Sequence, residues 1–243
     1  MARFHTYAQH FLKSPRLVAE LVGHSNVRKN DLVYDLGAGS GVITSVLAER
    51  CKQVVAVEVE PLALEKLHKN VGDLQNVTIL KQDILTLKEP DEPYKIFANI
   101  PFSLSAEVIK KFTESPRPPK TMYLIVQKQF ARKLVPGDDH FTSLLSAQAG
   151  MRFVVRIRKP LKKTDFTPPP AVDTVLLELK LRDEPLVPSK ELESYRRYVE
   201  ECFSRQKYFA EQPLAAAGIS PELRPSQLTL EQWVALWTAK TKK

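Results

Sequence analysis

The sequence predicts an α/β protein with a mainly parallel sheet, an antiparallel hairpin at one edge of that sheet, and a small all-helical domain at the C-terminus. From residue 31 to residue 126, short apolar runs alternate with amphipathic segments of helical period. This alternation is typical of parallel strands joined by right-handed crossovers. Two β-rich runs follow, and after residue 182 only helical patterns remain. We therefore expect one domain at 1–181 and a second at 182–243.

The elements of the first domain follow from local patterns. Ser14 before Pro15 is an N-cap followed by a proline at the first helical position, so a helix begins there. Apolar runs bounded by turn residues predict strands, and apolar residues of period 3.6 predict helices. The expected order is strand 31–36, a helix from 42, strand 54–57, helix 61–71, strands 77–80 and 95–98, helix 106–112, and strand 122–126.

The later part of the chain changes character. Residues 152–158 alternate charged and apolar side chains, and 172–181 form a long β-rich run. The stiff proline-rich segment 167–170 precedes that run, so the two strands are expected to form an antiparallel hairpin at the sheet edge. Ser189 is expected to cap the next helix, and a capping box at Thr229 is expected to open the last one.

Composition limits the possible partners. The 243 residues carry a net charge of +8, which suits a polyanion such as RNA. Cys51 and Cys202 are far apart and outside any C-x-x-C pair, which argues against a disulfide framework or a zinc site. No segment approaches the roughly 20 apolar residues of a membrane span. We therefore expect a cytoplasmic protein that binds no metal and no membrane, and we expect a monomer.

Basic residues gather in four groups in the later two thirds of the chain. Together these groups could form an extended phosphate-binding surface. They are Lys110, Lys111, Arg117 and Lys120; Lys128, Arg132 and Lys133; Arg152, Arg156, Arg158, Lys159, Lys162 and Lys163; and Arg196, Arg197, Arg205 and Lys207. These groups and the helical domain 182–243 are therefore expected to hold RNA.

A glycine-rich turn follows the first strand of the sheet. Residues 35–41 read DLGAGSG, and such a turn lets a ligand approach backbone N–H groups at a helix N-terminus. The next strand ends in Val57-Glu58-Val59-Glu60, where a carboxylate usually accepts hydrogen bonds from ribose hydroxyls. Glu58 follows that strand directly, whereas Glu60 precedes Pro61 and suits the helix dipole. Both carboxylates are candidates for the ribose contact.

A third strand end carries Asp83 and Ile84. The aspartate could accept a hydrogen bond from an adenine amino group while the isoleucine packs on the ring. Glycines, Glu and Asp on three consecutive strand ends suit an adenosine-bearing ligand. The spacing resembles class I S-adenosylmethionine-dependent methyltransferases more than NAD enzymes, whose usual pattern is G-x-G-x-x-G. The resemblance implies a Rossmann-like fold and S-adenosyl-L-methionine as the cofactor.

The stretch FANIPF, residues 97–102, ends a further strand. An exocyclic adenine amine is a poor nucleophile because its lone pair is delocalised into the ring. The side-chain oxygen of Asn99 and the carbonyl of Ile100, turned outward at Pro101, could accept both amine hydrogens and localise that lone pair. Phe102 could then stack on the base. The segment therefore predicts methylation of an adenine amino group.

The chain resembles the Erm-type ribosomal RNA adenine N6-methyltransferases and the related small-subunit rRNA adenine dimethylases. Residues 9–12, QHFL, are similar to that family's Q-N-F-L, and 35–41 to its glycine motif. Residues 99–102, NIPF, are similar to N-[IL]-P-[YF]. Residues 126–131, VQKQFA, resemble V-Q-K-E-F-A, and 166–173, FTPPPAVD, resemble F-x-P-x-P-x-V-D-S. These motifs occur in the family's order over nearly the whole chain.

The resemblance implies roles for individual residues. Phe102 and Phe166 are expected to enclose the target base, and the catalytic segment is Asn99, Ile100, Pro101 and Phe102. His10 stands where the family usually has Asn, and Phe102 replaces a commoner Tyr, which keeps the ring and loses a hydroxyl. Cofactor contacts are expected from Gln9, His10, Leu12, Gly37, Gly39, Glu58, Val59, Asp83, Ile84 and Asn99.

The resemblance also implies the substrate. It points to mono- or dimethylation of a specific unpaired adenine in 23S rRNA, before ribosome assembly is complete, with resistance to macrolide, lincosamide and streptogramin B antibiotics as the consequence. One alternative is the small-subunit dimethylase, which acts on adjacent adenines of a 16S rRNA hairpin. Ile100 rather than Leu, and the short C-terminal domain, favour the 23S reading. Another alternative is a non-catalytic RNA- or DNA-binding relative on the same fold, such as the mitochondrial transcription factor B proteins.

Overall fold

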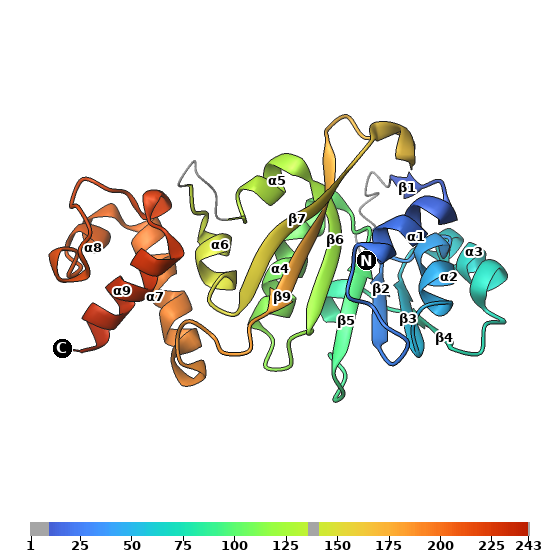
Figure 1. The fold of residues 1–243 in the computed structure, drawn as a ribbon, viewed down its shortest axis with the longest axis horizontal. Coiled ribbons are helices and arrows are strands. Elements are labelled where there is room, and N and C mark those ends of the chain that lie inside the picture. Colours follow the sequence, from blue (N-terminus) through green and yellow to red (C-terminus); the bar gives the residue numbers. More distant parts are fainter. Residues whose placement is uncertain (1–9, 136–140, 243) are drawn as a thin grey trace, which may run out of the picture. The chain divides into compact units, whose positions relative to one another are not determined.

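The chain forms two compact units, each with its own hydrophobic core. The computed structural model describes residues 10–135 and 141–242, and its elements are labelled in Figure 1. The first unit comprises Met1–Lys128 and Arg156–Lys180, and the second comprises Gln129–Val155 and Leu181–Lys243.

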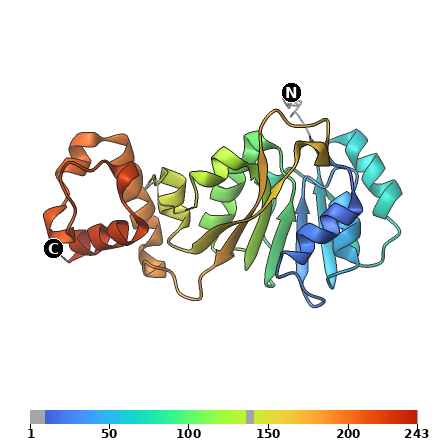
Figure 2. The ribbon, with the colours of Figure 1, turned by 45° about the horizontal axis from the view of Figure 1, so that its top comes forward.

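A seven-stranded sheet with the order β4-β3-β2-β5-β6-β9-β7 is the main element of the first unit, and Figure 2 shows its strands side by side. Strands β4, β3, β2, β5 and β6 pair in parallel, and β9 pairs antiparallel with β6. The predicted parallel sheet with an antiparallel edge is therefore confirmed. The strands are β1 Phe11–Leu12, β2 Leu32–Leu36, β3 Gln53–Glu58, β4 Val77–Lys81, β5 Tyr94–Ala98, β6 Thr121–Gln127, β7 Phe153–Leu161, β8 Phe166–Thr167 and β9 Thr174–Leu181.

The crossover helices follow the strands closely, as short α/β connections require. The α-helices are α1 Pro15–Gly23, α2 Val42–Ala48, α3 Pro61–Val71, α4 Ser105–Glu114, α5 Lys128–Arg132, α6 Leu144–Ala149, α7 Leu192–Ser204, α8 Gln206–Ala210 and α9 Leu230–Thr241. Short 3-10 turns are η1 Ile84–Thr86, η2 Phe102–Leu104, η3 Lys163–Asp165, η4 Ser189–Glu191, η5 Ala215–Ala217 and η6 Pro225–Gln227.

Two of the three caps predicted from the sequence lie at the start of an α-helix. The Ser14 hydroxyl accepts the hydrogen bond that caps α1, and Thr229 and Gln232 form the reciprocal capping box of α9. Ser189 is different, because it opens the 3-10 turn η4 and α7 begins only at Leu192. Ser189, which follows Pro188, thus starts a tighter helical turn before the α-helix than the sequence pattern predicts.

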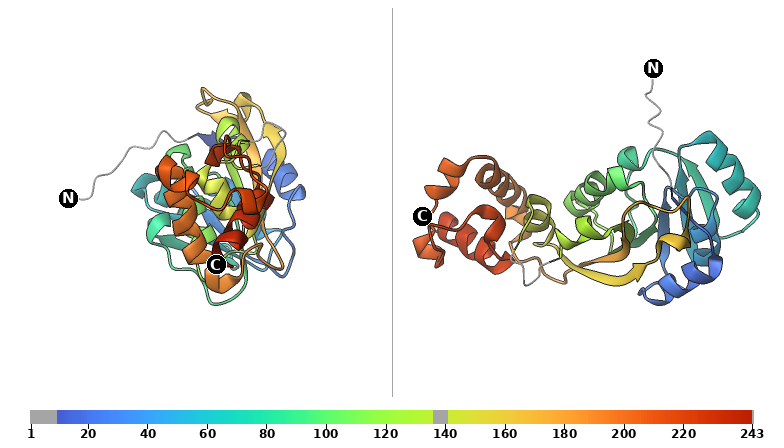
Figure 3. Two further views of the ribbon diagram at one scale, coloured as in Figure 1. Left: turned by 90° about the vertical axis from the view of Figure 1, so that its left-hand side faces the viewer. Right: turned by 90° about the horizontal axis from the view of Figure 1, so that it is seen from above.

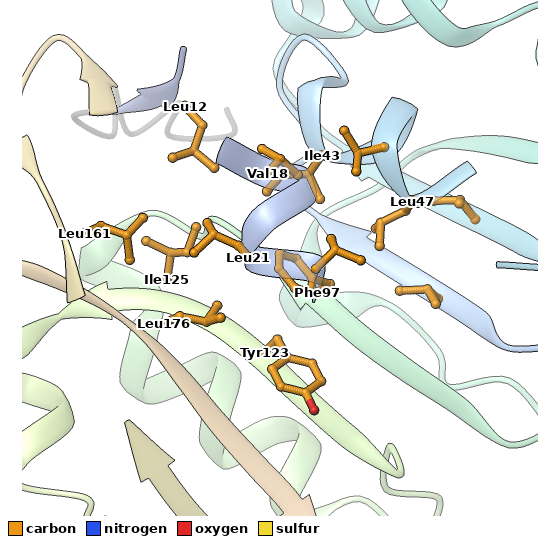
Figure 4. Close-up of a cluster of buried hydrophobic side chains, with 14 of the residues drawn as sticks. Leu12, Val18, Leu21, Ile43, Leu47, Phe97, Tyr123, Ile125, Leu161 and Leu176 are labelled. Atoms are coloured by element: carbon orange, nitrogen blue, oxygen red, sulfur yellow. The ribbon is translucent and has the colours of Figure 1, made fainter. Parts of the chain in front are cut away.

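Helices α1 and α2 bury their apolar faces in the core of the first unit. Leu21 of α1 and Leu47 of α2 are fully buried together with Phe97 of β5 and Tyr123 of β6, and Figure 4 shows these side chains in one cluster. The Tyr123 hydroxyl donates a hydrogen bond of 2.6 Å to the Glu178 carboxylate of β9. This hydrogen bond gives the buried hydroxyl a partner and links the antiparallel strand β9 to the parallel strand β6.

Aromatic side chains form the core of the second unit, whose helices α7, α8 and α9 are drawn in orange to red in Figure 3. Tyr195 and Trp233 are fully buried, and the Trp237 ring lies edge-on to Tyr195 at 5.7 Å. Helix α6 belongs to this unit because the carbonyl of Ala147 accepts a hydrogen bond from the Tyr195 hydroxyl. The segment 129–155, which was expected in the first domain, therefore belongs to the same unit as the C-terminal helices.

Three further findings concern the described residues only. No helix in 10–135 or 141–242 combines the length and the apolar character needed to cross a bilayer. The same residues bring no three His, Cys, Asp or Glu side chains together as a metal site. Cys51 and Cys202 are buried free thiols.

Asp35, at the end of β2, is a fully buried carboxyl group. Its Oδ2 accepts a hydrogen bond of 2.6 Å from the Thr44 hydroxyl of α2, while Oδ1 has no partner among the described residues. Burial raises the pKa of Asp35 to about 7, and the negative charge of Glu58 adds to this effect, whereas the Thr44 hydrogen bond opposes it. The folded state therefore retains a proton that the unfolded state loses at lower pH.

We expect Asp35→Asn to remove a pH dependence of stability. Since the folded pKa lies above the unfolded value, the wild-type protein should lose up to about 4 kcal/mol of unfolding free energy as the pH rises from about 4 to about 7. The asparagine variant should lack this part of the decline. Urea unfolding at about pH 5 and about pH 8, followed by far-UV circular dichroism, measures the difference. Tryptophan fluorescence is less suitable, because Trp233 and Trp237 both lie in the second unit, whereas Asp35 lies in the first. Equal declines in both proteins would contradict the prediction.

Candidate active site

A pocket opens at the carboxyl ends of the parallel strands β2, β3, β4 and β5, all within the first unit. Ligands of open α/β sheets bind at this edge. The wall residues that the sequence predicts are His10, Leu12, Gly37, Glu58, Val59, Asp83, Ile84, Asn99, Ile100, Pro101 and Phe102. Gln9 lies outside the described residues.

The glycine turn after β2 is held against β3. Gly37 and Gly39 have φ values of 68° and 57°, which favour glycine. The N–H groups of Gly37 and Ala38 both donate to the carbonyl of Val57, at 2.8 and 3.0 Å. A Cβ on Gly39 would lie 3.0 Å from the ring of Phe11. Glycine is therefore required here both by the backbone conformation and by the approach of the N-terminal segment.

Glu58 holds three backbone N–H groups around the pocket. Its Oε2 accepts from Gly39 at 2.9 Å, and its Oε1 accepts from Val59 at 2.8 Å and from Glu60 at 2.9 Å. Each carboxylate oxygen has about two acceptor positions, so Oε1 is saturated and Oε2 can accept one more hydrogen bond. This remaining position suits a ribose hydroxyl.

The structure separates the two acidic residues that the sequence left as alternatives. Glu58 is buried and lines the pocket. The Glu60 carboxylate instead accepts from the N–H groups of Leu62 and Ala63, and so caps helix α3. Glu60 is therefore occupied as a helix cap, and Glu58 is the carboxylate available to a ligand.

Asp83 and Ile84 form the wall at the end of β4. Oδ1 of Asp83 accepts from the N–H of Leu85 at 2.8 Å, which caps the turn η1, and the other oxygen accepts no hydrogen bond among the described residues. The Ile84 side chain is buried, and its Cδ1 would lie 3.7 Å from a Cβ on Gly37. An apolar surface thus lies beside a free acceptor, as binding of an adenine ring requires.

Asn99 follows β5 directly, and its side-chain orientation is fixed by the N-terminal segment. Nδ2 donates to the main-chain carbonyl of His10 at 2.7 Å. Because the donor side of the carboxamide is engaged there, Oδ1 remains available as an acceptor at the pocket. Ile100 is 1% exposed, so it offers the pocket its backbone rather than its side chain. Phe102 begins the turn η2 on the same wall.

Phe166 differs from the expectation. Its ring is completely buried in the hydrophobic core of the first unit, beside Leu12, and it does not line the pocket. The backbone of Phe166 in β8 pairs with that of Leu12 in β1. The structure thus places Phe166 as a support for the N-terminal segment, away from the position expected for a residue that encloses the base.

Several wall residues were not predicted from the sequence, among them Phe11, Ser40, Gln82 and Leu104. Phe11 is the aromatic residue among these four; its side chain is 40% exposed and lies over the glycine turn. Its place within the QHFL stretch was the available signal. Ser40 and Leu104 follow predicted residues by one and two positions, and Gln82 directly precedes Asp83. Only the folded chain brings these three residues to the wall.

The chemistry of the wall fits S-adenosyl-L-methionine. Glu58 and Asp83 contribute carboxylates, and no Lys or Arg among the described residues lines the pocket. Such a wall favours a ligand with positive charge, such as a sulfonium and an amino group, over the pyrophosphate of a dinucleotide. The free acceptor positions on Glu58 and Asp83 match the hydroxyl and amino donors of an adenosine.

Comparison with known proteins identifies the family. The family model for ribosomal RNA adenine dimethylase matches residues 2–216. An rRNA adenine N-6-methyltransferase from Saccharopolyspora erythraea is 28% identical over 244 residues, which is 95% of this chain and 64% of that protein. Ribosomal RNA small subunit methyltransferase A from Caldanaerobacter subterraneus is 27% identical over 257 residues, which covers 96% of this chain and 95% of that protein. This chain thus spans less than two thirds of the first relative and nearly all of the second.

The fold agrees with this match. The crystal structure of the 23S rRNA methyltransferase ErmE superposes with a TM-score of 0.81 at 26% identity, and the alignment covers 94% of this chain and 98% of that one. The family model, the relatives and the solved structure all cover the pocket residues on β2 to β5. The chain therefore belongs to the ribosomal RNA adenine dimethylase family of S-adenosylmethionine-dependent methyltransferases.

Proposed function

We propose that this protein methylates N6 of a specific unpaired adenine in 23S rRNA, before ribosome assembly is complete. The observation that carries the proposal is the Asn99 carboxamide, whose donor side is held by the His10 carbonyl and whose oxygen remains available at the pocket. The methyl donor, when bound, supplies an electrophilic methyl group on a positively charged sulfur. All other requirements fall on residues of this chain.

The Asn99 oxygen and the Ile100 carbonyl accept the two hydrogens of the adenine amine. Hydrogen bonds to both hydrogens favour a tetrahedral nitrogen with a localised lone pair, which is the nucleophilic form. Phe102 stacks on the base, an interaction worth about 1 to 3 kcal/mol. No strong base is required, because the amine proton becomes acidic once the nitrogen carries the additional methyl group. The wall therefore orients the amine and holds it ready for transfer.

The base must leave its stack to enter such a pocket. Moving a base out of a helix costs a few kcal/mol, and the cost is smallest for a base in a loop. An unpaired adenine is therefore the preferred target. For this chain we propose an adenine in the peptidyl-transferase loop of 23S rRNA. Its methylation would impair binding of macrolide, lincosamide and streptogramin B antibiotics and so confer resistance.

One comparison supports the choice of 23S rRNA, and several relatives support the alternative. The superposed crystal structure is that of a 23S rRNA methyltransferase, whereas the name of the relative from Saccharopolyspora erythraea, rRNA adenine N-6-methyltransferase, specifies no ribosomal subunit. The relative from Caldanaerobacter subterraneus is named a small-subunit methyltransferase and matches over nearly its full length. The second candidate function is therefore dimethylation of 16S rRNA.

Transfer of radiolabelled methyl groups to purified 23S and 16S rRNA tests the proposal. We expect label in 23S rRNA and a primer-extension stop at one adenine, because a dimethylated adenine halts the polymerase. Label in 16S rRNA alone would establish the second candidate. Binding of RNA without any label would indicate a non-catalytic relative.

The basic surplus lies mainly outside the C-terminal helices. Residues 182–243 contain ten Lys or Arg and nine Asp or Glu, so their charges nearly cancel. Residues 104–181 contain fourteen Lys or Arg and seven Asp or Glu. Residues 152–164, which include edge strand β7, carry six basic residues and no acidic one. We propose that the RNA backbone is held chiefly by 104–181. The expected RNA-binding role of 182–243 then depends on shape and on local contacts more than on net charge.

Asn99→Ala should lower the rate of methyl transfer by at least about 100-fold, as loss of a catalytic hydrogen-bonding group commonly does. RNA affinity should stay nearly unchanged, because one neutral contact is lost among many phosphate contacts. Single-turnover methyl transfer and filter binding measure the two quantities. Asn30→Ala, at an exposed asparagine before β2 and so at the opposite edge of the sheet, is the control. Wild-type turnover in Asn99→Ala would refute the role of the carboxamide.

Phe102→Ala should slow methyl transfer by about 5- to 150-fold, which corresponds to the loss of about 1 to 3 kcal/mol of stacking. Phe102→Tyr should remain active because the ring is retained. The two variants are compared with wild type at saturating cofactor and RNA. If alanine and phenylalanine gave equal rates, the ring would not hold the base.

Arg156→Ala should weaken RNA binding and lower the salt dependence of binding by about one unit of slope, as the loss of one phosphate contact does. Arg156 is exposed on β7 and forms no ion pair among the described residues. Arg50→Ala is the matched control, because Arg50 is exposed between α2 and β3, at the opposite edge of the sheet from the pocket and outside 104–181. Equal effects of the two substitutions on RNA binding would contradict a specific role of β7.

A further inference from the structure

His10 contacts residues from two other motifs at the pocket. Its main-chain carbonyl accepts the hydrogen bond from Asn99 Nδ2 at 2.7 Å. Its imidazole ring stacks on the Phe102 ring, with 5.6 Å between centroids and an interplanar angle of 27°. Its Nδ1 lies 2.8 Å from the carbonyl oxygen of Pro168. One residue therefore joins the strand end after β5 to the proline-rich segment that precedes β9.

The chemistry of these contacts fixes the ring. A carbonyl oxygen is only an acceptor, so Nδ1 of His10 must carry the hydrogen that it shares with Pro168. The hydrogen bond sets the ring's rotation, and the stack on Phe102 sets its face. An offset stack of two aromatic rings adds to their burial. Phe102 is only half-buried, so the imidazole is a principal support for one face of its ring.

The backbone around His10 is anchored independently of its side chain. Phe11 pairs with Thr167 and Leu12 pairs with Phe166 in the short antiparallel ladder of β1 and β8. The N–H of Lys13 also donates to the carbonyl of Asp165 at 3.0 Å. The His10 carbonyl that meets Asn99 is therefore held by this ladder, and a change of the His10 side chain leaves that anchor in place.

We propose that the His10 imidazole is a positioning residue for the target base, which acts by holding the Phe102 ring; this inference rests on the proposed function. His10 was expected to contact the cofactor, and a contact of that kind would appear as weaker cofactor binding. A residue that supports Phe102 instead affects the rate of transfer at saturating cofactor. The two roles therefore predict different kinetic signatures.

Three substitutions separate the contacts of the ring. His10→Asn keeps a side-chain N–H in the place of Nδ1, so the Pro168 hydrogen bond can persist while the ring is lost. His10→Phe keeps the ring and loses that hydrogen bond. His10→Ala loses both. His68→Asn, on the exposed face of α3, makes the same chemical change away from the pocket and is the control.

We expect His10→Asn and His10→Ala to lower kcat by about fivefold, which corresponds to the loss of one aromatic pair. The KM for S-adenosylmethionine should change by less than about twofold. The affinity for S-adenosylhomocysteine, measured by calorimetry, should also change by less than about twofold. His10→Phe should recover most of the loss. In a Phe102→Ala background, His10→Asn should have almost no further effect, because the group it supports is gone. The control His68→Asn should match wild type.

Proton NMR of the histidine ring tests the contact without any activity. The chain has five histidines, and the His10 signals are identified by their loss in His10→Asn. Their ring-current shift should disappear in Phe102→Leu. If kcat falls equally with and without Phe102, or if only cofactor affinity falls, the positioning role is wrong while the proposed function stands. If neither rRNA is methylated, the proposed function and the role that rests on it both fail, even where the NMR contact is present.

Discussion

A carboxamide has one acceptor oxygen and one donor nitrogen, and in Asn99 the nitrogen is already engaged by the carbonyl of His10. This single hydrogen bond decides what the strand end after β5 can offer a substrate. With the nitrogen held, the oxygen is left to accept hydrogens from an amine. The bond also joins the N-terminal segment to the sheet, so the site is complete only when that segment is in place.

The N-terminal segment is itself held by contacts distant in sequence. Strand β1 pairs with β8, and the buried ring of Phe166 packs with Leu12 in the core. Residues 10–12 and the proline-rich segment therefore act as one structural unit, although His10 and Pro168 are 158 positions apart in the sequence. A motif residue can be important for the site without touching a ligand, because it holds the backbone that does.

Acidic and basic side chains lie in different regions of the protein, and these regions suit ligands of different charge. The pocket wall carries the carboxylates of Glu58 and Asp83, which suit a cationic donor, while β7 and its neighbouring loop carry a run of basic residues that suit phosphates. In the proposed function the methyl donor is cationic and the RNA is anionic, so the two ligands need walls of opposite sign. The helical second unit is almost balanced in charge.

Much of the fold and part of the site could be predicted from local sequence. The alternation of apolar runs and helical periods determined the parallel sheet, and the glycine turn and the strand ends indicated Glu58, Asp83 and Asn99, because each of these signals depends on neighbouring residues. Contacts between distant segments decided the rest. They buried Phe166, brought Phe11 over the glycine turn, and packed 129–155 with the C-terminal helices. A side chain's final neighbours depend on how strands pair and which way each residue faces, and only the tertiary structure specifies both.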